Sequence, residues 1–179
     1  MMVIEATTRR LPSTQVTSPI LWKQFWALFL NHSQRNVIYR LIQGKIPTKL
    51  FHYHCNPAND PHCALCLTTM ESTAHFFFYC EEKQNFWERL ILEYLWPGCT
   101  LRMIMDALYS LNFDLIEVLP NKSSLKPSPL LIIAITEVWK AHWRFIFDAT
   151  PLTSNSLLSS FRYSVLKMQS EDVLFSSSA

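Results

Sequence analysis

The chain of 179 residues is long enough for one hydrophobic core, and its 49% apolar content excludes an intrinsically disordered protein. The net charge is only +2, so the overall charge of the chain gives no argument for a polyanionic partner. Two glycines among many Leu, Phe and Trp residues favour helices joined by short connections.

The N-terminal part predicts a flexible lead-in followed by three helices. Residues 1–17 are polar and lack periodicity, whereas apolar residues recur at helical spacing in the segments that follow. Pro19 suits the first turn of the first helix, Ser33 is the expected N-cap of the second, and Gly44 stands where the second should end. Pro47-Thr48 starts a short third helix.

A run of four potential metal ligands comes next, with the spacing Cys63-x2-Cys66-x8-His75-x4-Cys80. A Cys-x-x-Cys turn lets two thiolates reach one ion, and the His and the third Cys can complete a tetrahedron. Three thiolates and one imidazole suit Zn²⁺, and four protein ligands are typical of a structural site with no open position. We therefore predict zinc in a reducing, intracellular compartment, and the pattern gives no preference between nucleus and cytoplasm.

Other interpretations of these cysteines stay open. They could be buried apolar side chains, disulfide partners, or, for Cys63 and Cys66, a redox pair. The odd count of five and the lack of a secretory signal argue against disulfides, and the strand-then-helix context of a thioredoxin-type pair is missing. His54, Cys55 or His62 could replace one of the four ligands, with Cys55 as the first reserve.

The segment that carries His75 is expected to be a helix that loosens before Cys80. Thr68 or Thr69 is its expected cap, with Glu71 or Ser72 in its first turn, where the helix dipole favours the acid Glu71. Five residues of α-helix turn through about 140° beyond one full turn, so His75 and Cys80 cannot face one ion on an unbroken helix.

The rest of the chain predicts further helices, over about residues 82–95, 101–108, 130–147 and 157–168, the last capped by Ser154 or Asn155. Charged residues interrupt the run at 130–147, so we expect no membrane span. The predicted fold is mainly α, a small helical domain built around a Cys3His zinc knuckle with additional C-terminal helices. This places the zinc-binding domain at 18–98, a helical extension at 99–170 and a disordered tail at 171–179.

Basic residues concentrate in the N-terminal third. Up to residue 59, seven Lys or Arg residues accompany one acid, whereas residues 60–93 carry six acids and two basic residues. A basic segment beside the zinc loop can contact phosphate, and the interleaved Tyr and His side chains can stack on unpaired bases. The competing interpretation is a set of solvated helix faces. The candidate nucleic-acid-binding residues are Arg35, Arg40, Lys45 and Lys49.

The order of these features resembles a known family. A Trp-rich helix leads to Gly44-Lys45-Ile46-Pro47-Thr48, then to Cys63-Ala64-Leu65-Cys66, then to Glu71-Ser72-Thr73-Ala74-His75 with Cys80, and then to Trp87. Residues 20–96 are similar to the zinc-binding domain that follows the reverse transcriptase in non-LTR (LINE-type) retrotransposons. In that family a Thr follows the Glu, whereas here Ser72 takes its place and the Thr is displaced to Thr73.

The resemblance implies zinc held by Cys63, Cys66, His75 and Cys80, and attachment to a polyprotein that handles its own RNA and target DNA. The implied partners are therefore RNA or DNA and the reverse transcriptase part of the same element. The predicted function is a structural zinc module that assists nucleic-acid binding; the alternative is a structural or protein-interaction domain without such binding. We predict no enzyme activity, because four protein ligands leave the ion no open position and no polymerase, endonuclease or deaminase motif is present.

Overall fold

The computed structural model describes residues 18–176, with side chains up to residue 171. The predicted mainly α fold is confirmed, and in this range β pairing is limited to isolated bridges, His62 with Met70 and Leu95 with Val118. None of the described helices combines the length and apolar character needed to cross a membrane. The elements are α1 (Pro19–Ala27), α2 (His32–Ile42), α3 (Lys49–Cys55), the π-helical turn η1 (His75–Tyr79), α4 (Glu81–Tyr94), α5 (Leu101–Ser110), α6 (Pro127–Asp148) and α7 (Ser154–Ser176).

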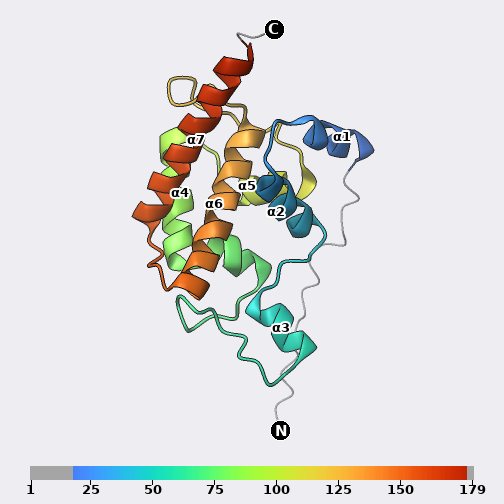
Figure 1. The fold of residues 1–179 in the computed structure, drawn as a ribbon, viewed down its shortest axis with the longest axis vertical. Coiled ribbons are helices and arrows are strands. Elements are labelled where there is room, and N and C mark those ends of the chain that lie inside the picture. Colours follow the sequence, from blue (N-terminus) through green and yellow to red (C-terminus); the bar gives the residue numbers. More distant parts are fainter. Residues whose placement is uncertain (1–17, 177–179) are drawn as a thin grey trace.

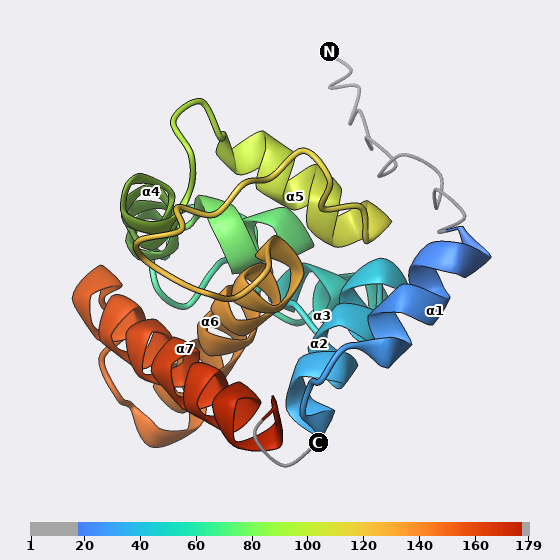
Figure 2. The same cartoon turned by 90° about the horizontal axis from the view of Figure 1, so that it is seen from above.

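Helix α6 lies at the centre of the fold. Its residues 130–138 are buried because α7 and α2 pack along it and η1 and α5 contact it. Figures 1 and 2 show α6 and α7 side by side, with α4 next to α7. One cluster of buried apolar side chains runs from Phe25 to Met168, so the segments 18–98 and 99–170 share a hydrophobic core.

Side-chain caps fix the start of the first two helices. Ser18 caps α1, and Pro19 occupies its first turn, as the sequence predicts. The predicted cap of α2 at Ser33 is wrong, because Asn31 takes that role: its side chain accepts a hydrogen bond from the Gln34 N–H at 3.0 Å. The Gln34 side chain accepts the Asn31 N–H at 2.8 Å in return, which completes a capping box.

The Gly44–Thr48 turn joins α2 to α3. Gly44 follows α2 with a φ of +62°, a left-handed conformation that glycine adopts without strain. The Thr48 hydroxyl accepts a hydrogen bond from the Phe51 N–H at 3.1 Å and caps α3. These two caps explain why a glycine and a threonine stand four positions apart, and the turn leads α3 to the end of the molecule where the cysteine loop begins (Figure 1).

Helix α7 differs from its prediction at both ends. Thr153, and not Ser154 or Asn155, caps it, because the Thr153 hydroxyl accepts a hydrogen bond from the Ser156 N–H at 3.1 Å. At the other end the helix continues to Ser176, past its predicted end and into the predicted tail. The predicted lead-in and the last three residues of the tail lie outside the described residues.

Candidate metal centre

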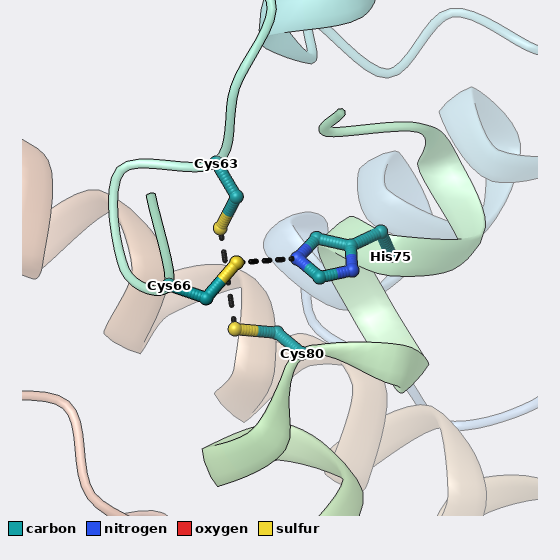
Figure 3. Close-up of side chains that lie close together, drawn as sticks. All are labelled: Cys63, Cys66, His75 and Cys80. Carbon is teal, nitrogen blue, oxygen red and sulfur yellow. Dashed lines mark hydrogen bonds between the residues drawn. The ribbon is translucent and has the colours of Figure 1, made fainter. Parts of the chain in front are cut away.

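Four side chains from two segments meet at one point. Cys63 and Cys66 come from the loop after α3, His75 opens η1, and Cys80 stands between η1 and α4; Figure 3 shows all four pointing toward a common centre. Their ligand atoms, three Sγ and one imidazole nitrogen, all lie within 4.8 Å of one another. The Cys63 and Cys80 sulfurs are 4.0 Å apart, and the Cys66 sulfur is 3.4 Å from His75 Nε2.

These distances fit the edges of a small coordination tetrahedron. Zn–S bonds of about 2.3 Å at tetrahedral angles separate two sulfurs by roughly 3.8 Å. A disulfide would require about 2 Å between the sulfurs, and all five cysteines are free. The donor set, its separations and its burial therefore fit a zinc ion bound by four protein ligands, which is the arrangement of a structural zinc site.

Short-range hydrogen bonds shape the cysteine loop. The Cys63 N–H donates to the Thr69 carbonyl at 2.8 Å, and the Leu67 N–H donates to the Cys63 carbonyl at 2.9 Å. The second bond closes a tight turn around the Cys-x-x-Cys pair, and it places Leu67 at a φ of +59°. The loop is thus a knuckle that holds the Cys63 and Cys66 sulfurs on its inner side (Figure 3).

A π-turn brings His75 and Cys80 into line. The Cys80 N–H donates to the His75 carbonyl at 3.3 Å, an i to i+5 bond that widens the helical turn. The predicted loosening of the helix before Cys80 is therefore present, in the form of one π-helical turn. The predicted cap at Thr68 or Thr69 is wrong: the Ser72 hydroxyl accepts the His75 N–H at 3.2 Å, a role that a Thr hydroxyl at this position could also fill.

Two side chains of α4 satisfy carbonyls of the π-turn. The indole N–H of Trp87 donates to the Phe77 carbonyl at 2.8 Å, and the Lys83 ammonium donates to the Phe76 carbonyl at 2.5 Å. Both side chains are fully buried. Because a buried carbonyl without a partner is costly, these bonds stabilise the irregular turn that carries His75. They also give the tryptophan of the sequence pattern a physical role.

The Cys63 and Cys80 thiols share one proton. The hydrogen bond between the two sulfurs lowers the pKa of Cys63 to about 4. The same contact, together with burial, raises the pKa of Cys80 above its ordinary value. Burial acts to raise the pKa of Cys66, but hydrogen bonds from the Thr68 backbone and hydroxyl outweigh it, and the pKa falls to about 7. The pocket thus favours thiolates at two of its three cysteines near neutral pH, which is the form that binds metal.

The sequence predicts that Glu71 serves the first turn of the helix that carries His75. In the structure its carboxylate instead binds the first turn of α3. Its side chain is buried, and one carboxylate oxygen accepts the backbone N–H of Lys49 at 2.9 Å. The other oxygen has no hydrogen bond, and it faces His142 Nε2 at 3.7 Å. Burial raises the pKa of Glu71, while the bond from Lys49 opposes that shift.

The reserve ligands lie apart from this cluster. Cys55 is exposed at the end of α3, next to His54, which is also exposed. His62 Nδ1 forms a 2.7 Å hydrogen bond with an Asp60 carboxylate oxygen on the surface. In the described part of the chain, the cluster therefore consists of the first-choice set and none of these three.

The four basic residues predicted to bind nucleic acid differ in their surroundings. Arg35 donates to a backbone carbonyl before α2 at 3.0 Å and lies over an indole ring of α1, so it holds the two helices together. Arg40 bonds within α2, and Lys49 forms a 3.6 Å ion pair with Asp60. Lys45 is exposed and has no such partner among the described residues.

The sequence prediction missed two buried polar residues near the cluster, Lys83 and His142. A signal for both was present. Lys83 falls at helical spacing before the buried Phe86 and Trp87, and His142 follows the buried Val138 by four residues on α6. A charged or polar side chain on an apolar stripe indicates a buried polar contact, because such groups are buried only together with a partner.

The comparison with protein families confirms the resemblance over part of the chain. Residues 7–87 match a family described as zinc-binding in reverse transcriptase, and the matched segment contains all four cluster residues and ends at Trp87. It covers less than half of the chain and excludes α5, α6 and α7. No curated protein and no solved structure matches the chain.

Proposed function

We propose that this chain, whose residues 7–87 match the reverse-transcriptase zinc-binding family, carries a structural zinc module that assists the binding of RNA or DNA. The observation that supports zinc is the convergence of three sulfurs and one imidazole nitrogen within 4.8 Å. Bound there, the ion supplies a cross-link between the cysteine loop and the η1–α4 corner. Four protein ligands would leave the ion no open coordination position, so we propose no catalysis at this site.

Metal analysis of the purified protein tests this part of the proposal. We expect one zinc per chain in the wild type, and strongly reduced zinc after replacement of Cys63, Cys66, His75 or Cys80, one at a time. Cys55→Ser is the matched control, because this thiol lies outside the cluster and is exposed. Loss of zinc in Cys55→Ser, or full occupancy in the cluster variants, would contradict the assignment.

Nucleic-acid binding is supported by the composition of the face formed by α1, α2 and the turn before α3. Residues 18–59 contain five Lys or Arg residues and no acid. Exposed rings accompany them: Trp26 is 49% exposed and Tyr39 is 42% exposed. Phosphate neutralisation by the Lys and Arg side chains and base stacking on these rings are the two contributions that single-strand binders combine.

Binding to a single-stranded oligonucleotide across salt concentrations tests this part. The affinity should fall as salt rises, and Lys45→Gln should reduce the slope of log K against log salt by about 0.7. Lys122→Gln, an exposed lysine on the connection before α6, is the control and should leave the slope unchanged. An affinity that does not respond to salt would rule out this function.

Protein interaction is the second candidate, favoured by a groove between α6 and α7. This groove has a volume of about 850 Å³, and aromatic side chains from both helices line it: Trp139, Trp143, Phe147 and Tyr163. Such a surface suits a neighbouring domain, and the reverse transcriptase part of the same element is the partner we propose for it. Sedimentation of the chain alone and mixed with the reverse transcriptase part tests this candidate. A chain that sediments as a monomer in both samples argues against it.

A further inference from the structure

The ammonium group of Lys83 is buried at the η1–α4 corner, the part of the fold that also carries His75 and Cys80. The side chain is 0% exposed, although it stands only three residues after Cys80 on the first turn of α4. Its Nζ donates to the Phe76 carbonyl, lies 4.7 Å from the Phe76 ring centroid and is 3.0 Å from His142 Nδ1. None of these contacts carries a negative charge. A buried ammonium is costly unless a negative charge compensates it, so its neighbours must be sought further out.

His142 connects Lys83 to Glu71. Burial lowers the pKa of His142 to about 2, and the nearby Lys83 acts in the same direction, so the imidazole is neutral. A neutral imidazole that accepts the Lys83 ammonium at Nδ1 carries its proton on Nε2. That nitrogen faces the otherwise unpaired Glu71 oxygen at 3.7 Å. The three side chains therefore form one polar chain, from α4 through α6 to the base of the cysteine loop.

The cysteines, together with Glu71, supply the negative charge that the direct contacts of Lys83 lack. Burial lowers the pKa of Lys83, and the charges of Cys80, Cys63, Glu71 and Cys66 act against that shift. Three thiolates and a neutral imidazole around a divalent cation leave an excess of one negative charge. Lys49, another cation near this region, is half-buried and paired with Asp60 on the surface. Among the described Lys and Arg side chains, Lys83 is the fully buried one, and it follows Cys80 by three residues.

We propose that Lys83 is the internal countercharge of the metal centre and that His142 of α6 holds it in position. This inference rests on the zinc part of the proposed function and is independent of nucleic-acid binding. It follows that the metal centre is not confined to the segment that matches the zinc-binding family, because α6 lies beyond residue 87. The C-terminal helices take part in holding the ion as well as in the hydrophobic core.

Zinc affinity of the full chain tests the proposal. Lys83→Met keeps the length of the side chain and removes its charge, and we expect the zinc dissociation constant to rise about tenfold or more. His142→Leu keeps Lys83 but removes the group that positions it, so a smaller rise is expected. Lys122→Met makes the same charge change on an exposed side chain and should leave the constant unchanged. Competition with a chromophoric chelator measures all three.

A structural role for Lys83 predicts a different pattern. If Lys83 only supports the fold, Lys83→Met should lower the unfolding midpoint in excess chelator as strongly as it does with zinc. If it also balances the centre, the midpoint with zinc should fall clearly further than the midpoint in chelator, where only the loss of the bond to the Phe76 carbonyl is felt. The thiolate-to-metal absorption of the Co²⁺-loaded variant shows whether the same four ligands are in place.

Each outcome decides between the two assignments. A wild-type chain that binds no zinc overturns both the zinc module and the countercharge. A wild type that binds zinc, with equal affinity in Lys83→Met and Lys122→Met, overturns the countercharge alone. If Lys83→Met fails to fold, an affinity of His142→Leu equal to that of the wild type also overturns it.

Discussion

The Glu71 carboxylate accepts a hydrogen bond from the backbone N–H of Lys49 across 22 positions of the chain. This residue connects three parts of the site, because its own N–H donates to the Pro61 carbonyl at 2.9 Å and its carbonyl accepts the Leu50 N–H at 3.3 Å. Glu71 therefore fixes the first turn of α3 against the exit of the cysteine loop. The helix dipole favours its negative charge there, but the helix concerned is α3.

Replacement of Glu71 should loosen α3 and the cysteine loop together. We expect Glu71→Ala to lower the free energy of unfolding by about 2 kcal/mol, since it leaves a partly buried N–H of the helix start without its acceptor. Chemical denaturation at a fixed free zinc concentration measures this loss. Glu88→Ala, on the exposed face of α4, is the control and should have little effect. Equal stability of the two variants would show that the Glu71 bond contributes nothing.

Loss of one metal ligand should have a local effect. In Cys66→Ser we expect faster amide hydrogen exchange over residues 56–74, because few core side chains hold that loop. Phe76, Phe77 and Phe78 are completely buried against the core, so exchange from α4 onward should stay slow. Cys99→Ser, outside the cluster, should resemble the wild type. Unchanged protection of the loop in Cys66→Ser would contradict a metal cross-link there.

Acid should weaken zinc binding, with a slope that depends on pH. With a pKa of about 4, Cys63 has already lost its proton at neutral pH, whereas the raised pKa of Cys80 keeps that thiol protonated. Between pH 6 and pH 8 zinc must displace the Cys80 proton, and below the Cys66 pKa of about 7 it must displace a second. The thiols should thus release about one proton per zinc at pH 8 and about two at pH 6.

Calorimetry in buffers of different ionisation enthalpy counts these protons. Because binding releases protons, affinity falls as pH falls, and it falls more steeply below pH 7 than above it. A proton count that stays constant between pH 6 and pH 8 would contradict the order assigned to the three thiols.

The sequence pattern identified what depends on short-range spacing. The apolar periodicities predicted the helices, and the i to i+5 separation of His75 and Cys80 required a break in α-helical geometry, which the π-turn supplies. Helix ends were less predictable where two capping residues compete, as Asn31 and Ser33 do before α2. A prediction from local sequence ranks such residues by type, whereas the structure selects the one whose hydrogen bonds can close.

The polar chain of Lys83, His142 and Glu71 could not be predicted, because it depends on tertiary packing. Lys83 and His142 are separated by 59 positions and meet only because α6 packs against η1. Taken singly, Lys83 is expected to be solvated, His142 to be exposed and Glu71 to be an acid at a helix start. The apolar stripes on which Lys83 and His142 fall indicated burial, but nothing in the spacing indicated the partner.

The left-handed conformation of Leu67 should be relieved by glycine. Its φ of +59° follows from the turn that closes around Cys63 and Cys66, and its side chain is 72% exposed, so little packing is lost on removal. A left-handed conformation costs a non-glycine residue about 1–2 kcal/mol, and the larger backbone entropy of unfolded glycine offsets roughly half of that. Leu67→Gly should therefore raise the stability of the zinc-loaded protein by about 0.5–1 kcal/mol.

The control for this substitution is Leu115→Gly, which removes a similarly exposed leucine, 80% exposed, from a turn without a positive φ. Since no strain is relieved there, this variant should be less stable than the wild type. Thermal unfolding at a fixed free zinc concentration measures both changes, and opposite signs are expected. If both variants lose the same stability, the Leu67 side chain contributes packing that outweighs its backbone strain, and the knuckle is held by more than its hydrogen bonds and the metal.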